Sequence, residues 1–301
     1  MKRLVLCAAT AVVSCSAFVM TAGGTSSAAS PPGLTVVNGT FLPAPGRAHS
    51  HAARGVINTG STNWSGYVQS AFSRHTFTAV TDTFVVPTVT SSVAGSQYAA
   101  DWVGIGGYND RTLVQDGIQT DVTTTADDAT TISYDAWTET LPRAERRLKL
   151  AVHAGDTVTA TVQETATNKW LMTVTDVTTA QSAGRSVRYR SSGLSAEAIH
   201  ERPCIGEPCS NFNNLAALAQ TTDVTFEPGS LSESAPGPTP TYEPLLCSAA
   251  APLCPADNAT LYSVAMDADD GTTVIAIPSI PNTTDTGFTL ADGDVPPSPP
   301  T

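Results

Sequence analysis

The 301-residue sequence predicts an all-β protein, and three observations support this class. Threonine and valine dominate the middle of the chain, where apolar and polar residues alternate with a period of two, as in half-buried strands. Glycine, aspartate or asparagine separates these short segments and favours turns between them. No long segment shows helical periodicity, and only 213–220 is a candidate for a short helix. The pattern alone leaves a sandwich and a barrel open.

Four segments show the strand pattern most clearly. The first ends at Pro87, and the turn signal Gly155-Asp156 precedes the second. A proline cannot donate a ladder hydrogen bond, so it is expected at a strand end rather than inside a central strand. The four predicted strands span 76–87, 157–162, 170–177 and 272–277.

The N-terminus has the parts of a secretory signal. Two basic residues precede an apolar run that extends from Leu4 to about Met20, and Ser27-Ala28-Ala29 provides a small-residue cleavage site. A membrane anchor is the alternative, but the run is short for a span and rich in alanine and serine. A lipoprotein box at Val12–Cys15 is a further alternative, which the apolar residues that follow it disfavour. We expect a secreted, extracellular protein with no membrane contact after signal removal.

The rest of the chain divides by composition into three parts. Residues 30–56 are rich in proline, glycine, alanine and serine and predict a flexible leader or propeptide. Residues 57–292 carry the strand pattern and predict one β-domain of a size that sandwiches reach. The proline-rich tail, 293–301, is predicted to be disordered. With the signal at 1–29, these boundaries account for the whole sequence.

The chain is acidic, with a formal net charge of −12, and removal of Lys2 and Arg3 with the signal makes it more negative. A strongly acidic protein repels phosphate backbones, so the charge argues against nucleic acid as a partner. Carboxylates lose their charge on acidification, so self-repulsion falls at low pH. The composition is therefore compatible with an acid environment.

Four cysteines remain after removal of the signal. In an exported protein they favour two disulfides, for which three connectivities exist. They form two close pairs along the sequence, so we expect local bridges, Cys204–Cys209 and Cys247–Cys254. Neither pair has the two-residue spacing of a zinc site and no histidine stands at ligand spacing, so we expect no metal.

Several common catalytic motifs are absent or incomplete. The sequence has no G-x-S-x-G elbow and no phosphate-binding glycine loop. His200-Glu201 begins like H-E-x-x-H, but Cys204 occupies the fifth position. Asp285-Thr286-Gly287 stands alone, whereas a pepsin-like site needs two such aspartates.

Four segments remain that carry acids, amides and tryptophans in a distinctive order. In sequence they read N-W-S-G-Y-V at 63–68, D-W-V-G-I-G-G at 101–107 continuing to L-V-Q-D-G at 113–117, D-A-W-T-E-T-L-P at 135–142, and A-E-A-I-H-E-R-P at 196–203. Each segment alone is weakly specific. Together they resemble the signature segments of the glutamic peptidases, or eqolisins, over about 60–290.

This resemblance implies a fold, an activity and a set of site residues. It implies a two-sheet antiparallel β-sandwich of the concanavalin A-like or jelly-roll type, and an endopeptidase that acts on polypeptides as a monomer without a cofactor. Gln115 and Glu201 match the catalytic glutamine and glutamate. The expected groove residues are Trp64, Trp102, Asp135, Trp137, Glu139 and Glu197. Trp137 could equally belong to the core and Glu197 could be a structural neighbour.

The residue chemistry is consistent with these roles. Peptide hydrolysis needs a base for water and a donor for the oxyanion. A carboxylate can be the base, and a glutamine amide donates without carrying a charge that acid could remove. Side chains alternate along a strand, so Glu197 and Glu201 share one face. His200 points to the other face, where we expect it at the surface.

One departure and two rival functions stand beside this prediction. Gly106 occupies a position where the family usually has aspartate, so one groove contact is in doubt. A β-sandwich glycoside hydrolase could use Asp135 and Glu139 as its two carboxylates, although the closely spaced E-x-D-x-E strand of that class is absent. A lectin-like binding module is the non-enzymatic alternative. Intact Gln115 and Glu201 argue against lost activity.

Overall fold

The computed structural model describes residues 36–37, 41–44, 55–71, 76–108, 110–206, 214–247 and 259–301. Within these ranges no α-helix occurs and the regular elements are β-strands, which confirms the predicted all-β class. No helix in the described ranges has the length and apolarity that crossing a membrane requires.

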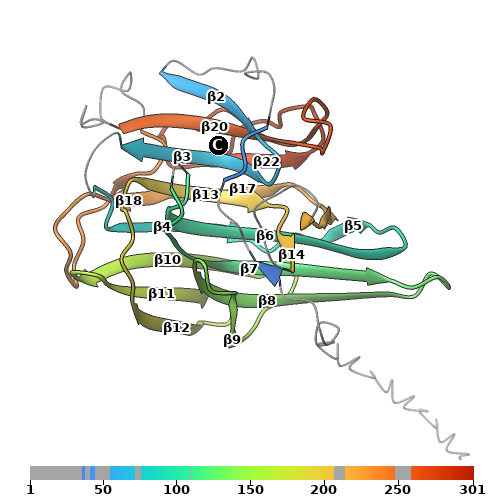
Figure 1. The fold of residues 1–301 in the computed structure, drawn as a ribbon, viewed down its shortest axis with the longest axis horizontal. Helices are drawn as coiled ribbons and strands as arrows, with labels where there is room; N and C mark the ends of the chain where they lie inside the picture. Colours follow the sequence, from blue (N-terminus) through green and yellow to red (C-terminus); the bar gives the residue numbers. More distant parts are fainter. Residues whose placement is uncertain are drawn as a thin grey trace, which may run out of the picture.

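One layer of the molecule carries the four motif segments. Its strands follow the hydrogen-bonded order β2–β20–β3–β13–β6–β7–β8–β9, and all neighbours are antiparallel except the parallel pair β2 and β20 (Figure 1). The bounds are Val56–Ser61 (β2), Ala259–Asp267 (β20), Trp64–Ala71 (β3), Ser195–Glu201 (β13), Gly95–Gly106 (β6), Leu113–Thr124 (β7), Thr130–Thr140 (β8) and Arg146–Ala151 (β9).

The second layer contains all four strands predicted from the sequence. β12, β11, β10 and β4 are neighbours in that order, and β17 and β18 pair with different ends of β4. β22 and β21 then continue from β17, and β19 pairs with β18. The bounds are Gln181–Arg188 (β12), Lys169–Asp176 (β11), Thr157–Ala166 (β10), Ala79–Val85 (β4), Val224–Phe226 (β17), Ser230–Ser232 (β18), Phe288–Asp292 (β22), Val274–Pro278 (β21) and Glu243–Pro244 (β19).

The two layers belong to one continuous, curled sheet. β10 and β11 pack across the interior against β6 and β7, and β12 packs against β9. The layers are also joined by hydrogen bonds, because β20 pairs with β3 through Ala259–Val264 and with β21 through Met266 and Asp267. The predicted antiparallel all-β fold is therefore confirmed, while the sheet is nearly barrel-shaped instead of being divided into two separate sheets.

The strands of the two layers differ in their pattern of buried and exposed residues. β10 and β11 alternate buried with more exposed residues, as expected for strands with one face in the core. β6 and β7 are buried on both faces over most of their length. One apolar core lies between the layers. A second cluster, which we call the tryptophan cluster, includes Trp64, Trp102, Trp137, Leu113 and Ile199.

Short pairings complete the described fold. β1 (Val36–Val37) pairs with β14 (Cys204–Ile205), and β5 (Val89–Ser91) pairs with β16 (Gln220–Thr221). β15 (Ala217–Leu218) runs parallel to β6. The helix suggested at 213–220 is wrong for its described part, because strand pairing with β6 and β5 holds this segment extended.

Two segments of the predicted leader and tail are described. In the leader, the backbone N–H of Ala44 donates to Gly60 O (3.1 Å) and that of Thr62 donates to Leu42 O (2.9 Å), so 41–44 lies against the domain. The rest of 30–56 before Gly55 is outside the described residues, apart from β1. The tail after β22 contains no strand, and its prolines are half-buried.

Candidate active site

Strand register brings the predicted site residues to one face of the first layer. Directly opposed residues on antiparallel strands point to the same side of a sheet, and residues two apart share a face. Three rows of opposed residues therefore cross β13, β6, β7 and β8 on this face. They are Glu197–Gly104–Gln115–Glu139, Ile199–Trp102–Gly117–Trp137 and Glu201–Ala100–Gln119–Asp135. Trp64 on β3 lies opposite Glu201 and extends the third row.

Both carboxylate oxygens of Glu201 accept hydrogen bonds from neighbouring side chains. Trp102 Nε1 donates to Oε2 at 2.9 Å, and Asn63 Nδ2 donates to Oε1 at 3.1 Å. Glu201, Trp102 and Asn63 are buried. Two N–H donors stabilise the ionised form of a carboxylate, so these contacts orient Glu201 and offset part of the free-energy cost of burying its charge.

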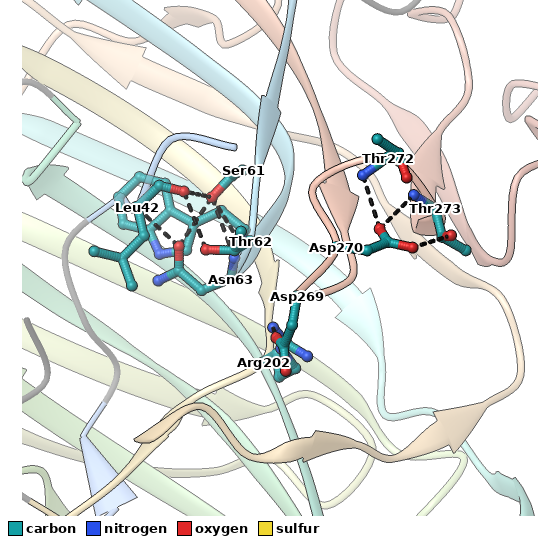
Figure 2. A network of polar contacts seen from close by, with 10 residues as sticks. Leu42, Ser61, Thr62, Asn63, Arg202, Asp269, Asp270, Thr272 and Thr273 are labelled. Carbon is teal, nitrogen blue, oxygen red and sulfur yellow. Dashed lines mark hydrogen bonds and ion pairs between the residues drawn. The ribbon is translucent and has the colours of Figure 1, made fainter. Parts of the chain in front are cut away.

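Contacts on the far side of its amide set the orientation of Asn63. Its Oδ1 accepts from the Ser61 hydroxyl (2.9 Å) and from the backbone N–H of Leu42 (3.0 Å), as Figure 2 shows. Because the oxygen is held by these donors, the Nδ2 group is directed to Glu201. The Asn63 carbonyl also accepts from Arg202 N (2.8 Å), so Asn63 binds the end of β13 twice. Arg202 in turn pairs with Asp269 at 2.6 Å.

Gln115 is held by the acid opposite it in the sheet. Its Nε2 donates to Glu139 Oε2 at 2.6 Å, and both side chains are buried. This short bond to a carboxyl group fixes the position of the amide on β7. A primary amide has two N–H groups, so Glu139 can orient Gln115 while the amide remains a donor toward the same face of the sheet.

Trp102 lies between the two predicted catalytic residues. Its Nε1 binds Glu201 in the third row, while its Cζ3 lies beside Gly104 in the first row, where an added Cβ would be only 2.8 Å away. That Cβ would also approach Gln115 Cβ at 3.3 Å, so glycine at 104 leaves room for the indole next to Gln115. Trp64 packs edge-on against Trp102, with ring centroids 5.0 Å apart.

Glu197 is a buried carboxyl group on the same face. Neither oxygen has a hydrogen-bond partner of good geometry among the described residues. Burial raises the pKa of Glu197 well above its usual value. The nearby Ser195 hydroxyl lowers this pKa, and the charge of Asp110 raises it further. Glu197 therefore keeps its proton at a higher pH than an exposed glutamate does, and as an acid it can donate an O–H.

Asp135 belongs to a charged cluster at the β9 side of this face. Arg147 on β9 contacts Asp135 at 2.7 Å and Asp121 at 2.9 Å, with Glu145 at 4.0 Å. Burial, followed by the nearby Asp121, raises the pKa of Glu145 to about 8, although Arg147 opposes the shift. Burial likewise raises the pKa of Asp135, and Arg147 lowers it.

The predicted groove residues form a covered cluster. Trp64, Trp102 and Trp137 are fully buried, and Asp135 is partly exposed. Phe41, from the predicted leader, packs on this cluster with ring centroids 5.8 Å from Trp64 and 4.7 Å from Tyr108. Part of the cover is therefore the leader itself, and the groove stays a prediction.

Sequence reasoning missed two residues that the site uses. Asn63 stands next to Trp64 in the first motif, and this adjacency was its only signal. Arg147 has no signal in the sequence, because its partners come from two strands and the loop before β9, which only the folded sheet brings together.

Three other predictions concern His200, Gly106 and the cysteines. His200 points away from Glu201 as expected, but the prediction that it lies at the surface is wrong, because the second layer buries it completely. Gly106 has φ +91°, and a Cβ there would overlap the Thr112 carbonyl oxygen, so this backbone does not accept the aspartate usual in the family. Cys204 and Cys247 are disulfide-bonded. Cys209 and Cys254 lie outside the described residues, so the pairing stays a prediction.

No group of three or more His, Cys, Asp or Glu side chains that could hold a metal ion occurs in the described part of the chain.

Comparison with known proteins identifies the family. The model of the peptidase A4 family matches residues 62–241, which include all eight predicted site residues. Aspergillopepsin-2 of Aspergillus niger is 31% identical over 185 residues, which cover 55% of this chain and 62% of that protein. The chain thus spans less than two thirds of this relative.

A solved structure agrees in fold. The crystal structure of scytalido-glutamic peptidase with a transition state analog inhibitor superposes with a TM-score of 0.54 at 20% identity, covering 77% of this chain and 98% of that one. A second structure of that peptidase, with a peptide-based transition state analog, has the same TM-score and coverage. Because the family model covers more than half of the sequence, the chain belongs to the peptidase A4 family, the glutamic peptidases that its four motif segments resemble.

Proposed function

We propose that this protein is a secreted endopeptidase that hydrolyses peptide bonds in acid, with Glu201 and Gln115 as its catalytic pair. The observation that carries the proposal is the environment of Glu201, a buried carboxylate whose two oxygens accept N–H donors from Trp102 and Asn63. It lies on the same face as Gln115. The proposal includes removal of residues 1–29 and the description of the curled sheet as a two-sheet antiparallel sandwich of the concanavalin A-like or jelly-roll type.

Each residue has a defined part in the proposed reaction. Glu201 takes a proton from water, which attacks the scissile carbonyl carbon, and the same proton then passes to the leaving amine nitrogen. Gln115, oriented by Glu139, donates an amide N–H to the oxyanion of the tetrahedral intermediate. Trp102 and Asn63 position Glu201 and do not exchange protons. Glu139 orients the Gln115 amide, and Glu197 keeps its proton to a higher pH than an exposed glutamate does.

The rival glycoside hydrolase has less support from the family to which the chain belongs. Its two candidate carboxylates hold protein partners, since Asp135 is bound to Arg147 at 2.7 Å and Glu139 accepts the Gln115 amide at 2.6 Å, but Glu201 holds partners too. The peptidase A4 model matches residues 62–241, which contain all three acids, and this match favours peptide hydrolysis. We therefore propose peptide hydrolysis alone.

The test is hydrolysis of a denatured protein by the purified mature chain between about pH 3 and 8. Glu201→Gln and Gln115→Ala should each reduce the rate at least about a hundredfold, because a base and an oxyanion donor each contribute that much in other enzymes. Circular dichroism checks that both variants fold. A folded Glu201→Gln variant with near wild-type rate, or a wild-type maximum at pH 7 or above, would refute the proposal.

A further inference from the structure

A buried acid–histidine pair lies directly behind the proposed base. Asp101 on β6 and His200 on β13 are opposed residues in the sheet, and His200 Nδ1 lies 2.8 Å from Asp101 Oδ1. Both side chains have no exposed surface. The peptidase chemistry proposed above does not use them, since they point into the space between the two layers.

The pair stands one residue away from the contact that holds Glu201. Trp102 and Glu201 follow Asp101 and His200 on the same two strands, and alternation turns them to the opposite face. There Trp102 Nε1 donates to Glu201 Oε2 at 2.9 Å. Side-chain contacts thus join β6 and β13 on both faces of the sheet at successive positions, and we call the Asp101–His200 contact the tie. A shift between these strands would disturb both contacts together.

The surroundings of His200 make the tie dependent on its charge. Asp292 Oδ1 on β22 lies 3.9 Å from His200 Nε2, and Asp223 is the next acid near Asp292. On β3 the opposed residue is Ser65, whose hydroxyl donates to Val264 O instead. A protonated imidazole therefore faces two carboxyl groups and has a donor on each ring nitrogen, while a neutral one keeps a single N–H and loses the charge attraction.

We infer that the Asp101–His200 pair is a positioning device for the catalytic face, which holds β6 against β13 so that Trp102 keeps its hydrogen bond to Glu201. This inference rests on the proposed function of Glu201. The pair acts through Trp102 and does not touch substrate. Through this contact the charge of His200, which lies outside the site, controls the rate of peptide hydrolysis.

The pH range of this control follows from the environment of His200. Burial by itself lowers the pKa of His200, but the charge of Asp101, its hydrogen bond and Asp292 together raise it above the usual value. A histidine whose pKa is raised on folding stabilises the fold fully below its unfolded value, about 6.5. This contribution disappears as the pH rises through the higher folded value. The tie should hold in acid and be released in alkali.

The experiment follows the indole N–H signal of Trp102 by NMR together with steady-state kinetics as a function of pH. The chain has four tryptophans, so the signal can be assigned with a Trp102→Phe variant. In the wild type we expect the Trp102 signal and kcat to change together on the alkaline side, with KM changed less than about twofold, since the pair does not contact substrate.

Three variants separate positioning from a structural role. His200→Ala should lower kcat about tenfold or more in acid, which is the rate change expected when one modest interaction is lost from the transition state. The neutral double variant Asp101→Asn/His200→Gln keeps a hydrogen-bonded pair without a titrating histidine. It should retain acid activity within about threefold and show no shared alkaline transition. Glu227→Gln, which alters a carboxylate bonded to Asn282 at 2.8 Å in the second layer, is the matched control and should leave both readouts unchanged.

The outcomes distinguish failure of the role inferred for the Asp101–His200 pair from failure of the proposed function of Glu201. If His200→Ala does not fold, the double variant and the wild-type titration still decide the case. The inference is overturned if the Trp102 indole signal does not change with kcat on the alkaline side in the wild type. It is also overturned if the double variant keeps the wild-type alkaline limb of kcat while Glu201→Gln is inactive. An active Glu201→Gln variant instead removes the proposed function, and with it the catalytic purpose of the pair.

Discussion

Replacing Trp102 by phenylalanine removes one N–H donor from Glu201 and leaves an aromatic ring against Trp64. The lost bond, 2.9 Å long and fully buried, joins a neutral donor to the carboxylate form of Glu201. Hydrogen bonds to charged groups contribute about 1.5–3 kcal/mol. Because the bond stabilises the ionised form, the acid limb of the rate profile should move to higher pH by about one to two units.

The assay is the pH dependence of kcat on a peptide substrate. At a pH on the acid limb, the rate should fall about ten- to a hundredfold, which is the same free energy expressed as a rate ratio. KM should change little, since the indole N–H faces Glu201. Melting temperature and circular dichroism must show that the variant remains folded at each pH used.

A matched control exists in the same chain. Trp170 is also fully buried and its Nε1 donates to Tyr189 O at 3.0 Å, but it packs in the core between the layers. Trp170→Phe should lower stability by a comparable loss of one hydrogen bond and leave the acid limb in place. If Trp102→Phe keeps the wild-type limb, or if both variants move it equally, the role assigned to Trp102 is incorrect.

Two further predictions concern stability. Gly106→Asp should lower the free energy of unfolding by about 3 kcal/mol or more, since positive φ alone costs about 1–3 kcal/mol and the new Cβ would overlap Thr112 O. Gly155→Asp is the control for the φ effect alone, because Gly155 has φ +87° and open space around its Cβ position. Equal losses of stability for the two variants in urea unfolding would contradict the predicted overlap with Thr112 O. Glu145 has a folded pKa of about 8, above its unfolded value, so its neutral form stabilises the fold in acid and this contribution is lost as the pH rises toward 8. Urea midpoints between about pH 4 and 9 should therefore fall less steeply for Glu145→Gln than for the wild type, and parallel slopes would contradict this assignment.

Local pattern predicted the class of the fold and much of its strand content. The period of two in 157–162 and 170–177 reappears as β10 and β11, which have one buried and one more exposed face. Alternation along β13 also predicted that His200 and Glu201 point to opposite faces. Strand period is a property of neighbouring residues, so a single sequence contains it.

Burial of a face could not be predicted in the same way. His200 was expected at the surface, yet the second layer covers it and supplies Asp292 from β22. The helix at 213–220 failed for a similar reason, because pairing with β6 and β5 decides that conformation. Both errors arise where distant strands replace water as the neighbour of a segment.

The sequence by itself determined the strand pattern, the acidic charge and the four motif segments that contain Gln115 and Glu201. Only the tertiary structure decided which side chains hold them. Asn63 and Glu201 are 138 residues apart, and Trp102 and Glu201 are 99 apart, yet each pair forms a hydrogen bond. The physical reason is that the ladder between β3, β13 and β6 sets which residues stand opposite one another, and a one-residue shift in register would turn every one of them to the other face.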